Sequence, residues 1–316
     1  MRPALPDLAA EFAATAEKAV VAAGGADLAR RAEADPARRP AVAALLDGLG
    51  IADLDPRADV ETAAAAAELC RVAGRYAVPY PLVAALLAGP TGRPLSLVPA
   101  ARPMADHGDL FPAWTVVDPT GAGRPARPAG ARLASKLGPF VTDLEADGDA
   151  RPVPARDVAL HMTLTGWRIL GTVERAVELA VEHVQGRHQF GQALAQFQAV
   201  QFQLADAAVA CDGLRELCRY TLWRVLTDAS AAPVDPLALR LHAIDVARSV
   251  LRTTQQLFGA AGLCDEYDIS ILVRHVQPDL RLPFGSEETA TALYEAVSRH
   301  GFESMFRHGG EGPGAA

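Results

Sequence analysis

Arginine and glutamine side chains gather in one segment, residues 186–201, which reads GRHQFGQALAQFQAVQ. A guanidinium such as that of Arg187 grips phosphate oxygens in bidentate fashion, and glutamine amides add further hydrogen-bond donors. The two glycines before position 192 leave backbone N–H groups accessible to a ligand. This composition suits a phosphate-rich ligand, although an ordinary connection between two helices with an ion-paired arginine would have the same composition.

The cysteine spacing and the charge balance argue against two other classes of site. The four cysteines, at positions 70, 211, 218 and 264, form no CxxC or other metal-ligand spacing, so we expect no metal site. Thirty basic residues against thirty-eight acidic ones give a net charge of −8, which disfavours electrostatic binding to nucleic acid. No signal-like segment begins the chain, and no apolar run is long enough to span a membrane. We expect a reduced, cytoplasmic protein.

The hydrophobic pattern predicts which elements position the arginine and glutamine segment. Apolar residues at helical spacing predict helices over 4–23, 39–49 and 60–75. The helical pattern returns at 156, where long stripes predict an antiparallel bundle with short connections, and a last helix is predicted over 286–305. The segment 186–201 would then connect the first two helices of the bundle.

The stretch between these helical regions differs in proline content and in the spacing of its apolar residues. Residues 90–154 hold eleven of the 23 prolines, and apolar residues alternate around 95–98, 114–118 and 140–144. Such alternation predicts short strands. Length alone suggests two domains, but the pattern predicts three, followed by a disordered tail: 1–92, 93–154, 155–308 and 309–316.

Three ordered motifs resemble those of the acyl-CoA dehydrogenases. The segment 186–201 resembles the family's RxxFG…FQ signature, QLFGAAG at 256–262 resembles its QxxGGxG turn, and GSEE at 285–288 resembles its GTSE loop. The resemblance implies a mainly α fold with a small β domain. Its parts would be an N-terminal helical domain, a reduced middle β domain and a C-terminal four-helix bundle.

The resemblance also implies FAD as cofactor and an acyl-CoA thioester as substrate. Arg187, Gln189 and Phe190 would touch the pyrophosphate and the ring end of a flavin that lies between subunits, with Gln198 assisting. Gln256 and Gly259 would meet the adenosine portion of FAD, and Ser286 and Glu288 would match the adenine-side residues. Two positions depart from the family motifs, because Ala260 replaces the second glycine of the turn and Ser286 replaces a threonine.

The catalytic base of the family has no carboxylate counterpart in this sequence. Its usual position, before the glycine of the GTSE loop, holds Phe284, and the alternative position, 26 residues before the motif arginine, holds His161. A neutral imidazole can act as a base, although a core or interface histidine is the commoner situation. Asp279 would be solvated or paired with an arginine. On the helix of His161, Trp167 and Arg168 would either reach an acyl or CoA site or serve in core packing and a surface ion pair.

The predicted middle domain also lacks the TEP-x-x-GSD-like stretch and the Trp-Ile-Thr-like strand that cradle the flavin ring in the family. The chain therefore resembles the shorter subunit of the heteromeric acyl-CoA dehydrogenases of actinobacterial steroid breakdown, which form heterodimers or α2β2 tetramers. A larger dehydrogenase subunit would supply the base and the ring cradle, and electron-transfer flavoprotein would accept the electrons.

Two alternatives stay open: a self-sufficient acyl thioester oxidoreductase that uses His161, and a flavin-free scaffold subunit. The residues do not identify the acyl chain.

Overall fold

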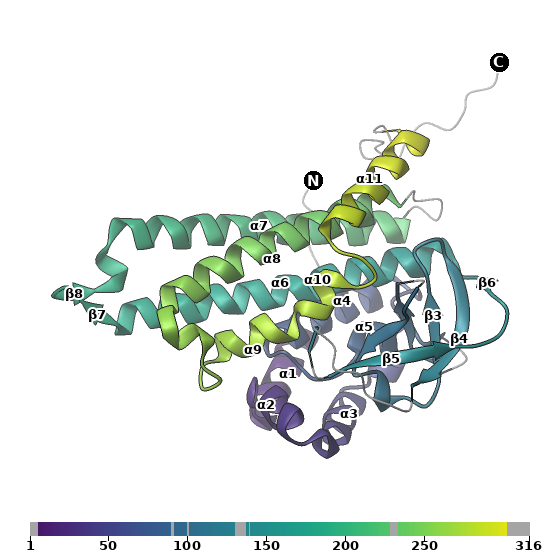
Figure 1. Ribbon diagram of the computed structural model, residues 1–316, viewed down its shortest axis with the longest axis horizontal. Coiled ribbons are helices and arrows are strands. Elements are labelled where there is room, and N and C mark those ends of the chain that lie inside the picture. The colour runs from purple at the N-terminus through teal and green to yellow at the C-terminus, as the bar shows by residue number, and fades with distance from the viewer. Residues whose placement is uncertain are drawn as a thin grey trace.

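A computed structural model describes residues 6–89, 92–99, 101–129, 137–138, 140–227 and 233–301 of the chain. A small sheet lies at one side of the helices, and three long helices run side by side across the molecule (Figure 1). The predicted fold class, mainly α with a small β region, is confirmed. The predicted tail 309–316 lies outside the described residues, as does the end of the last predicted helix.

The chain begins with a group of helices that includes two beyond the predicted ones. In order they are α1 (Asp7–Ala23), α2 (Asp27–Ala34), α3 (Arg39–Gly48), α4 (Val60–Arg75) and α5 (Leu82–Leu86). Asp59 caps α4, because its side chain accepts a 2.7 Å hydrogen bond from the backbone N–H of Thr62. Helices α2 and α5 were not predicted, since eight and five residues are too few to show a helical period.

The sheet contains the predicted strands and three more. Its strands are β1 (Leu95–Leu97), β2 (Met104–Asp106), β3 (Trp114–Val117), β4 (Ala122–Pro128), β5 (Val141–Ala146) and β6 (Arg151–Pro152). The order is β1-β3-β4-β5-β2, with β6 beside β4, and only the β1–β3 pair is parallel. The fully buried Trp114 anchors the sheet through its indole N–H, which donates to the carbonyl of Gly108 at 2.8 Å. Strand β4 was not predicted, since Pro125 and Pro128 interrupt its pattern.

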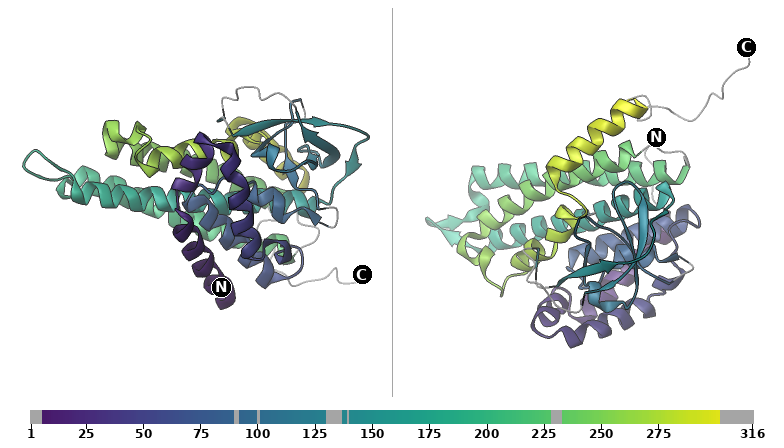
Figure 2. Two further views of the ribbon diagram at one scale, coloured as in Figure 1. Left: turned by 90° about the horizontal axis from the view of Figure 1, so that it is seen from below. Right: turned by 45° about the vertical axis from the view of Figure 1, so that its right-hand side comes forward.

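Three long helices form the rest of the core. They are α6 (Ala155–Gly186), α7 (Gln198–Thr227) and α8 (Val234–Phe258), and the hairpin of β7 (His188–Gln189) and β8 (Gln192–Ala193) joins the first two. The shorter α9 (Asp268–His275), α10 (Gln277–Arg281) and α11 (Ser286–His300) follow. Helix α6 packs against α4, α7 and α8, so it is the central element of the molecule (Figure 2).

Two glycines allow α4 and α6 to cross at close range. A Cβ atom on Gly74 would collide with the backbone carbonyl of Arg168, and a Cβ atom on Gly171 would collide with the backbone carbonyl of Arg71. The hydroxyl of Thr172 adds a 3.1 Å hydrogen bond to the carbonyl of Gly74. Each helix therefore presses a glycine against the backbone of the other.

Substituting glycine by alanine at two helical positions should have opposite effects. In Gly171→Ala the new methyl group must displace the α4 backbone, so we expect the free energy of unfolding to fall by about 2 kcal/mol or more. In Gly213→Ala, in the middle of α7 with nothing within 4 Å of the new Cβ, we expect a gain of about 0.5–1 kcal/mol. Thermal and urea unfolding of both variants test this. Equal changes in the free energy of unfolding for the two variants would contradict the close crossing of α4 and α6.

Candidate functional site

The first motif lies at an exposed tip of the bundle. Helix α6 ends at Gly186, and the N–H of Leu194 bonds back to the carbonyl of Arg187 at 2.9 Å, closing the β7–β8 hairpin. Phe190 stands 91% exposed at a positive φ of 55°, directly before Gly191. Arg187, Gln189 and Phe190 all face solvent, and so does Gln198 at the start of α7. These four side chains are free to meet a ligand or another chain.

The second motif lies beside this tip. Gln256 and Gly259 are exposed at the end of α8, where Gly259 has a positive φ of 61°. The ring of Phe258 stacks on His183 of α6 with centroids 4.1 Å apart, and Tyr267 meets Phe258 edge-on at 5.8 Å. This aromatic contact fixes the end of α8 against the end of α6. The structure thus brings the first two motifs together.

The third motif is in a different part of the molecule. Ser286 and Glu288 lie in the first turn of α11, where the hydroxyl of Thr289 donates to the carbonyl of Gly285 at 2.6 Å. In all views α11 stands away from the β7–β8 hairpin (Figures 1 and 2). A single chain therefore does not bring Ser286 and Glu288 to Arg187.

His161 lies in a small cavity between α6, the sheet and α10. The cavity has a volume of about 50 Å³, which is room for a few water molecules. The backbone N–H of Leu97 donates to Nε2 of His161 at 3.4 Å. Burial, together with the nearby charge of Arg240, lowers the pKa of His161 to about 3. His161 is therefore neutral at pH 7, and a base this weak is poorly suited to remove a proton.

Phe284 occupies the loop position at which a carboxylate was expected. The buried Arg240 lies under it, with its Cζ 5.5 Å from the centre of the phenyl ring. One Nη of Arg240 donates to the carbonyl of Phe284 at 2.6 Å, and the other donates to the carbonyl of Asp279 at 3.2 Å. Arg240 thus holds the 279–284 loop through hydrogen bonds to its backbone carbonyls.

A buried ion cluster lines the same cavity. Arg168, only 4% exposed, donates to Asp106 at 3.0 Å and to Asp279 at 3.5 Å. Burial raises the pKa of Asp279 to about 6. The expected pairing of Asp279 with an arginine is confirmed, and so is core packing for the fully buried Trp167. The expected surface ion pair of Arg168 is corrected, because this pair is buried between α6, β2 and α10.

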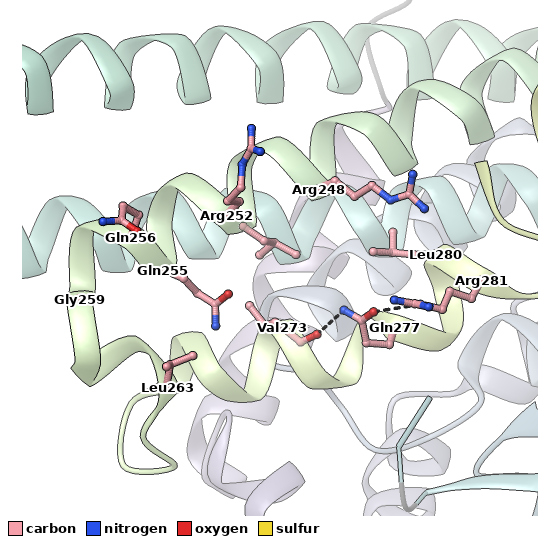
Figure 3. A pocket seen from close by; sticks show the side chains of 11 residues that line it. Arg248, Arg252, Gln255, Gln256, Gly259, Leu263, Val273, Gln277, Leu280 and Arg281 are labelled. Carbon is pink, nitrogen blue, oxygen red and sulfur yellow. Dashed lines mark hydrogen bonds between the residues drawn. The ribbon is translucent and has the colours of Figure 1, made fainter. Parts of the chain in front are cut away.

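One set of cationic residues was missed by the sequence analysis. Gln256 and Gly259 line a groove of about 410 Å³ between α8 and α9–α10, together with Arg248, Arg252 and Arg281 (Figure 3). The sequence did contain a signal for unpaired arginines, because no carboxylate lies three or four residues from Arg252 or Arg281.

Within the described part of the chain, no group of three or more potential ligands could hold a metal, and no helix could cross a membrane.

Comparison with known proteins matches residues 161–296 to the model of the acyl-CoA dehydrogenase C-terminal domain. A curated relative, the short-chain specific acyl-CoA dehydrogenase of Megasphaera elsdenii, is 34% identical over 122 residues, which are 37% of this chain and 31% of that protein. The match thus spans about a third of the relative's length.

Solved structures of two other proteins share the fold over nearly the whole chain. The Tcur3481–Tcur3483 steroid ACAD has a TM-score of 0.75 at 18% identity, covering 94% of this chain and 99% of that one. The ChsE4–ChsE5 complex from Mycobacterium tuberculosis has a TM-score of 0.74 at 14% identity, with the same coverage.

Acidification tests the buried, neutral state of His161. Because its pKa is about 3 in the folded chain and about 6.5 when unfolded, the unfolded state binds one more proton between these values. The stability from His161 is full above pH 6.5 and falls by about 1.4 kcal/mol per pH unit below it. We therefore expect wild type to lose stability more steeply than His161→Gln between about pH 6.5 and 4.5 in urea unfolding.

The comparison of the two proteins cancels the opposite contribution of Asp279. Its raised pKa makes the folded state bind a proton first, so its contribution to stability grows on acidification in both proteins. Parallel stability curves for wild type and His161→Gln would show that the imidazole is not buried as described.

Proposed function

Because this chain carries an acyl-CoA dehydrogenase C-terminal domain over residues 161–296, we propose that it works as one subunit of a hetero-oligomeric acyl-CoA dehydrogenase. Members of this family are FAD-dependent flavoproteins. In this proposal the chain binds the diphosphate and adenosine end of an FAD shared with a larger dehydrogenase subunit. The larger subunit supplies the flavin-ring site and the catalytic carboxylate for α,β-dehydrogenation of an acyl-CoA.

The proposal rests on two observations: the predicted cofactor-contacting side chains are exposed, whereas the cavity around His161 is too small for a flavin ring. The predicted cofactor-contacting side chains Arg187, Gln189 and Gln256 are exposed at the tip of the bundle, ready to meet a neighbour. The cavity that contains His161 has only about 50 Å³, and the ion pair of Arg168 with Asp106 lines it. The residues present therefore fit the phosphate end of FAD, and they do not fit its three-ring end.

Exposed apolar side chains on the hairpin, after α8 and along α7 support a partner. Phe190 on the hairpin is 91% exposed, and Leu263 after α8 is 76% exposed. Helix α7 buries one face in the core but turns Phe202 and Val209 outward, at 60% and 70% exposure. Phe202 and Val209 lie seven residues apart, about two turns along α7, and neighbouring exposed apolar groups mark an interaction site. The ChsE4–ChsE5 structure is itself described as a complex, which supports a heteromeric partner here.

The small volume of the cavity and the low pKa of its imidazole weigh against a self-sufficient enzyme that uses His161 as base. The cationic tip weighs against a flavin-free scaffold, because a scaffold has no use for exposed arginine and glutamine side chains aimed at phosphate. In this proposal the chain works with a larger dehydrogenase subunit on an acyl-CoA substrate. Electron-transfer flavoprotein accepts the electrons, and the complex works in the cytoplasm.

Co-purification with a candidate larger dehydrogenase subunit tests the proposal. We expect a yellow complex in which Arg187→Gln weakens FAD binding about tenfold or more, because one charge-assisted contact to phosphate is lost. The matched control is Arg151→Gln, which removes the same charge from the exposed strand β6 and should leave FAD binding unchanged. FAD content and dehydrogenase activity of the complex are the readouts.

Three results would count against this assignment. Flavin content and activity of the partner that do not depend on this chain or on Arg187 would refute it. A colourless complex would revive the scaffold interpretation. A yellow homo-oligomer of this chain alone, whose flavin is reduced by an acyl thioester, would establish the self-sufficient enzyme instead.

A further inference from the structure

Three arginines without ion-pair partners lie along the groove between α8 and α9–α10, which we call the arginine groove. Arg248 and Arg252 come from α8 and Arg281 from α10, and all three side chains are exposed. Among the described residues none of the three forms an ion pair, whereas Arg75 and Arg274 each pair with two or more carboxylates. The chain as a whole carries a net charge of −8, so this face holds a local excess of positive charge.

The three guanidinium groups are placed to meet several carboxylates at once. Arg248 and Arg252 are four residues apart, so they lie about one turn apart on α8. Across the groove, Gln277 accepts a 3.2 Å hydrogen bond from Nε of Arg281 and donates a 2.8 Å bond to the carbonyl of Val273. Both Nη groups of Arg281 have no acceptor in the part of the chain that the structure describes, so they are available for a bidentate contact with a carboxylate.

This cationic end of the groove is separate from the motif residues. Arg248 precedes Gln256 by eight residues, which corresponds to about 12 Å along the axis of α8. Figure 3 shows Arg248 and Arg281 reaching toward one end of the groove, with Gln256 and Gly259 at the opposite end. A ligand held at Gln256 and Gly259 therefore leaves the charge of Arg248 and Arg281 without a counterpart.

The surroundings of these arginines are typical of a protein contact. Leu280 lies between Arg248 and Arg281 (Figure 3), and Leu251 and Val273 also line the groove. Apolar side chains surrounded by polar ones, with arginine as the cation, are common where two proteins meet. No carboxylate lines the described groove, so the negative charge must come from another molecule.

We infer that Arg248, Arg252 and Arg281 dock an acidic segment of the larger subunit, one that carries carboxylates about one helical turn apart. The inference rests on the proposed function for the identity of the partner, and it adds the surface and the chemistry of the contact. Complementary charges of this kind accelerate the association of two proteins and make it dependent on salt.

Charge reversal in the arginine groove tests this contact. We expect Arg248→Glu/Arg281→Glu to bind a candidate larger dehydrogenase subunit at least about tenfold more weakly than wild type at about 0.05 M NaCl, because attraction becomes repulsion. The matched control, Arg124→Glu/Arg151→Glu, makes the same change of charge at exposed positions of β4 and β6 and should bind as wild type does. Calorimetry with the purified full-length proteins measures the affinities.

Salt and stability measurements separate a charge contact from a folding defect. Raising NaCl from about 0.05 to 0.5 M should weaken the association of wild type more than that of Arg248→Glu/Arg281→Glu, because the variant has fewer attractive pairs to screen. Thermal unfolding of the variant should match that of wild type, since both side chains are exposed. If charge reversal unfolds the chain, Arg248→Gln/Arg281→Gln serves instead and should still weaken association.

A cross-link tests whether the docked segment is acidic. Ser249 is exposed beside Arg248, so Ser249→Cys can carry a photo-activated cross-linker, in a Cys264→Ser background because Cys264 is exposed as well. We expect the captured segment of the purified larger subunit to contain several Asp or Glu residues within about one helical turn. Capture of a segment without carboxylates overturns the inference.

The outcomes for the arginine groove and for the proposed function are distinguishable. Equal association of wild type and Arg248→Glu/Arg281→Glu overturns the groove contact, while the effect of Arg187→Gln on FAD decides the proposed function. If the groove variant associates normally but its complex loses FAD, the arginines serve the cofactor and the inference is wrong. If the groove variant dissociates while Arg187→Gln retains FAD, the inference stands and the proposed role of Arg187 is wrong. A wild-type chain that binds no larger subunit contradicts both.

Discussion

The buried guanidinium of Arg168 is the constraint on which the arrangement of the chain depends. It reaches from α6 to Asp106 at the end of β2 and to Asp279 on α10, and its own backbone carbonyl lies against Gly74 of α4. A charge at 4% exposure is tolerated only while its partners stay in place. Sheet, bundle and N-terminal helices are therefore held at one point.

Much of the fold was predictable because its signals are local. The helices at 39–48 and 60–75 and the strands at 95–97 and 114–117 follow from the spacing of apolar residues. The pairing of Arg168 with Asp106 was not predictable, because the two residues lie 62 positions apart and meet only through the packing of the sheet on α6. The arginine groove was missed for the same reason, since Arg281 joins Arg248 only after the chain has turned back along α8. The roles of the motif residues and the domain boundaries remain predictions.

The two ends of the molecule have different properties. Around His161 the chain is densely packed, with a neutral imidazole, a phenyl ring in place of a carboxylate and a small residual cavity. Around Arg187 it is open, with cations, amides and exposed rings. Dense packing around His161 stabilises the isolated chain, and the exposed side chains around Arg187 favour association with another chain. A subunit with both can fold by itself and still present an incomplete surface to another protein.

The crossing at Gly74 and Gly171 has a mechanical consequence. Because each helix touches the backbone of the other, α4 and α6 cannot slide or roll without a clash, so they form one rigid body. A motion that admits solvent to the region of His161 must then move the sheet and α10 away from α4 and α6, which stay fixed relative to each other. Amide hydrogens at the α4–α6 crossing should accordingly be among the slowest to exchange, and those of β1 and β2 among the first to report such an opening.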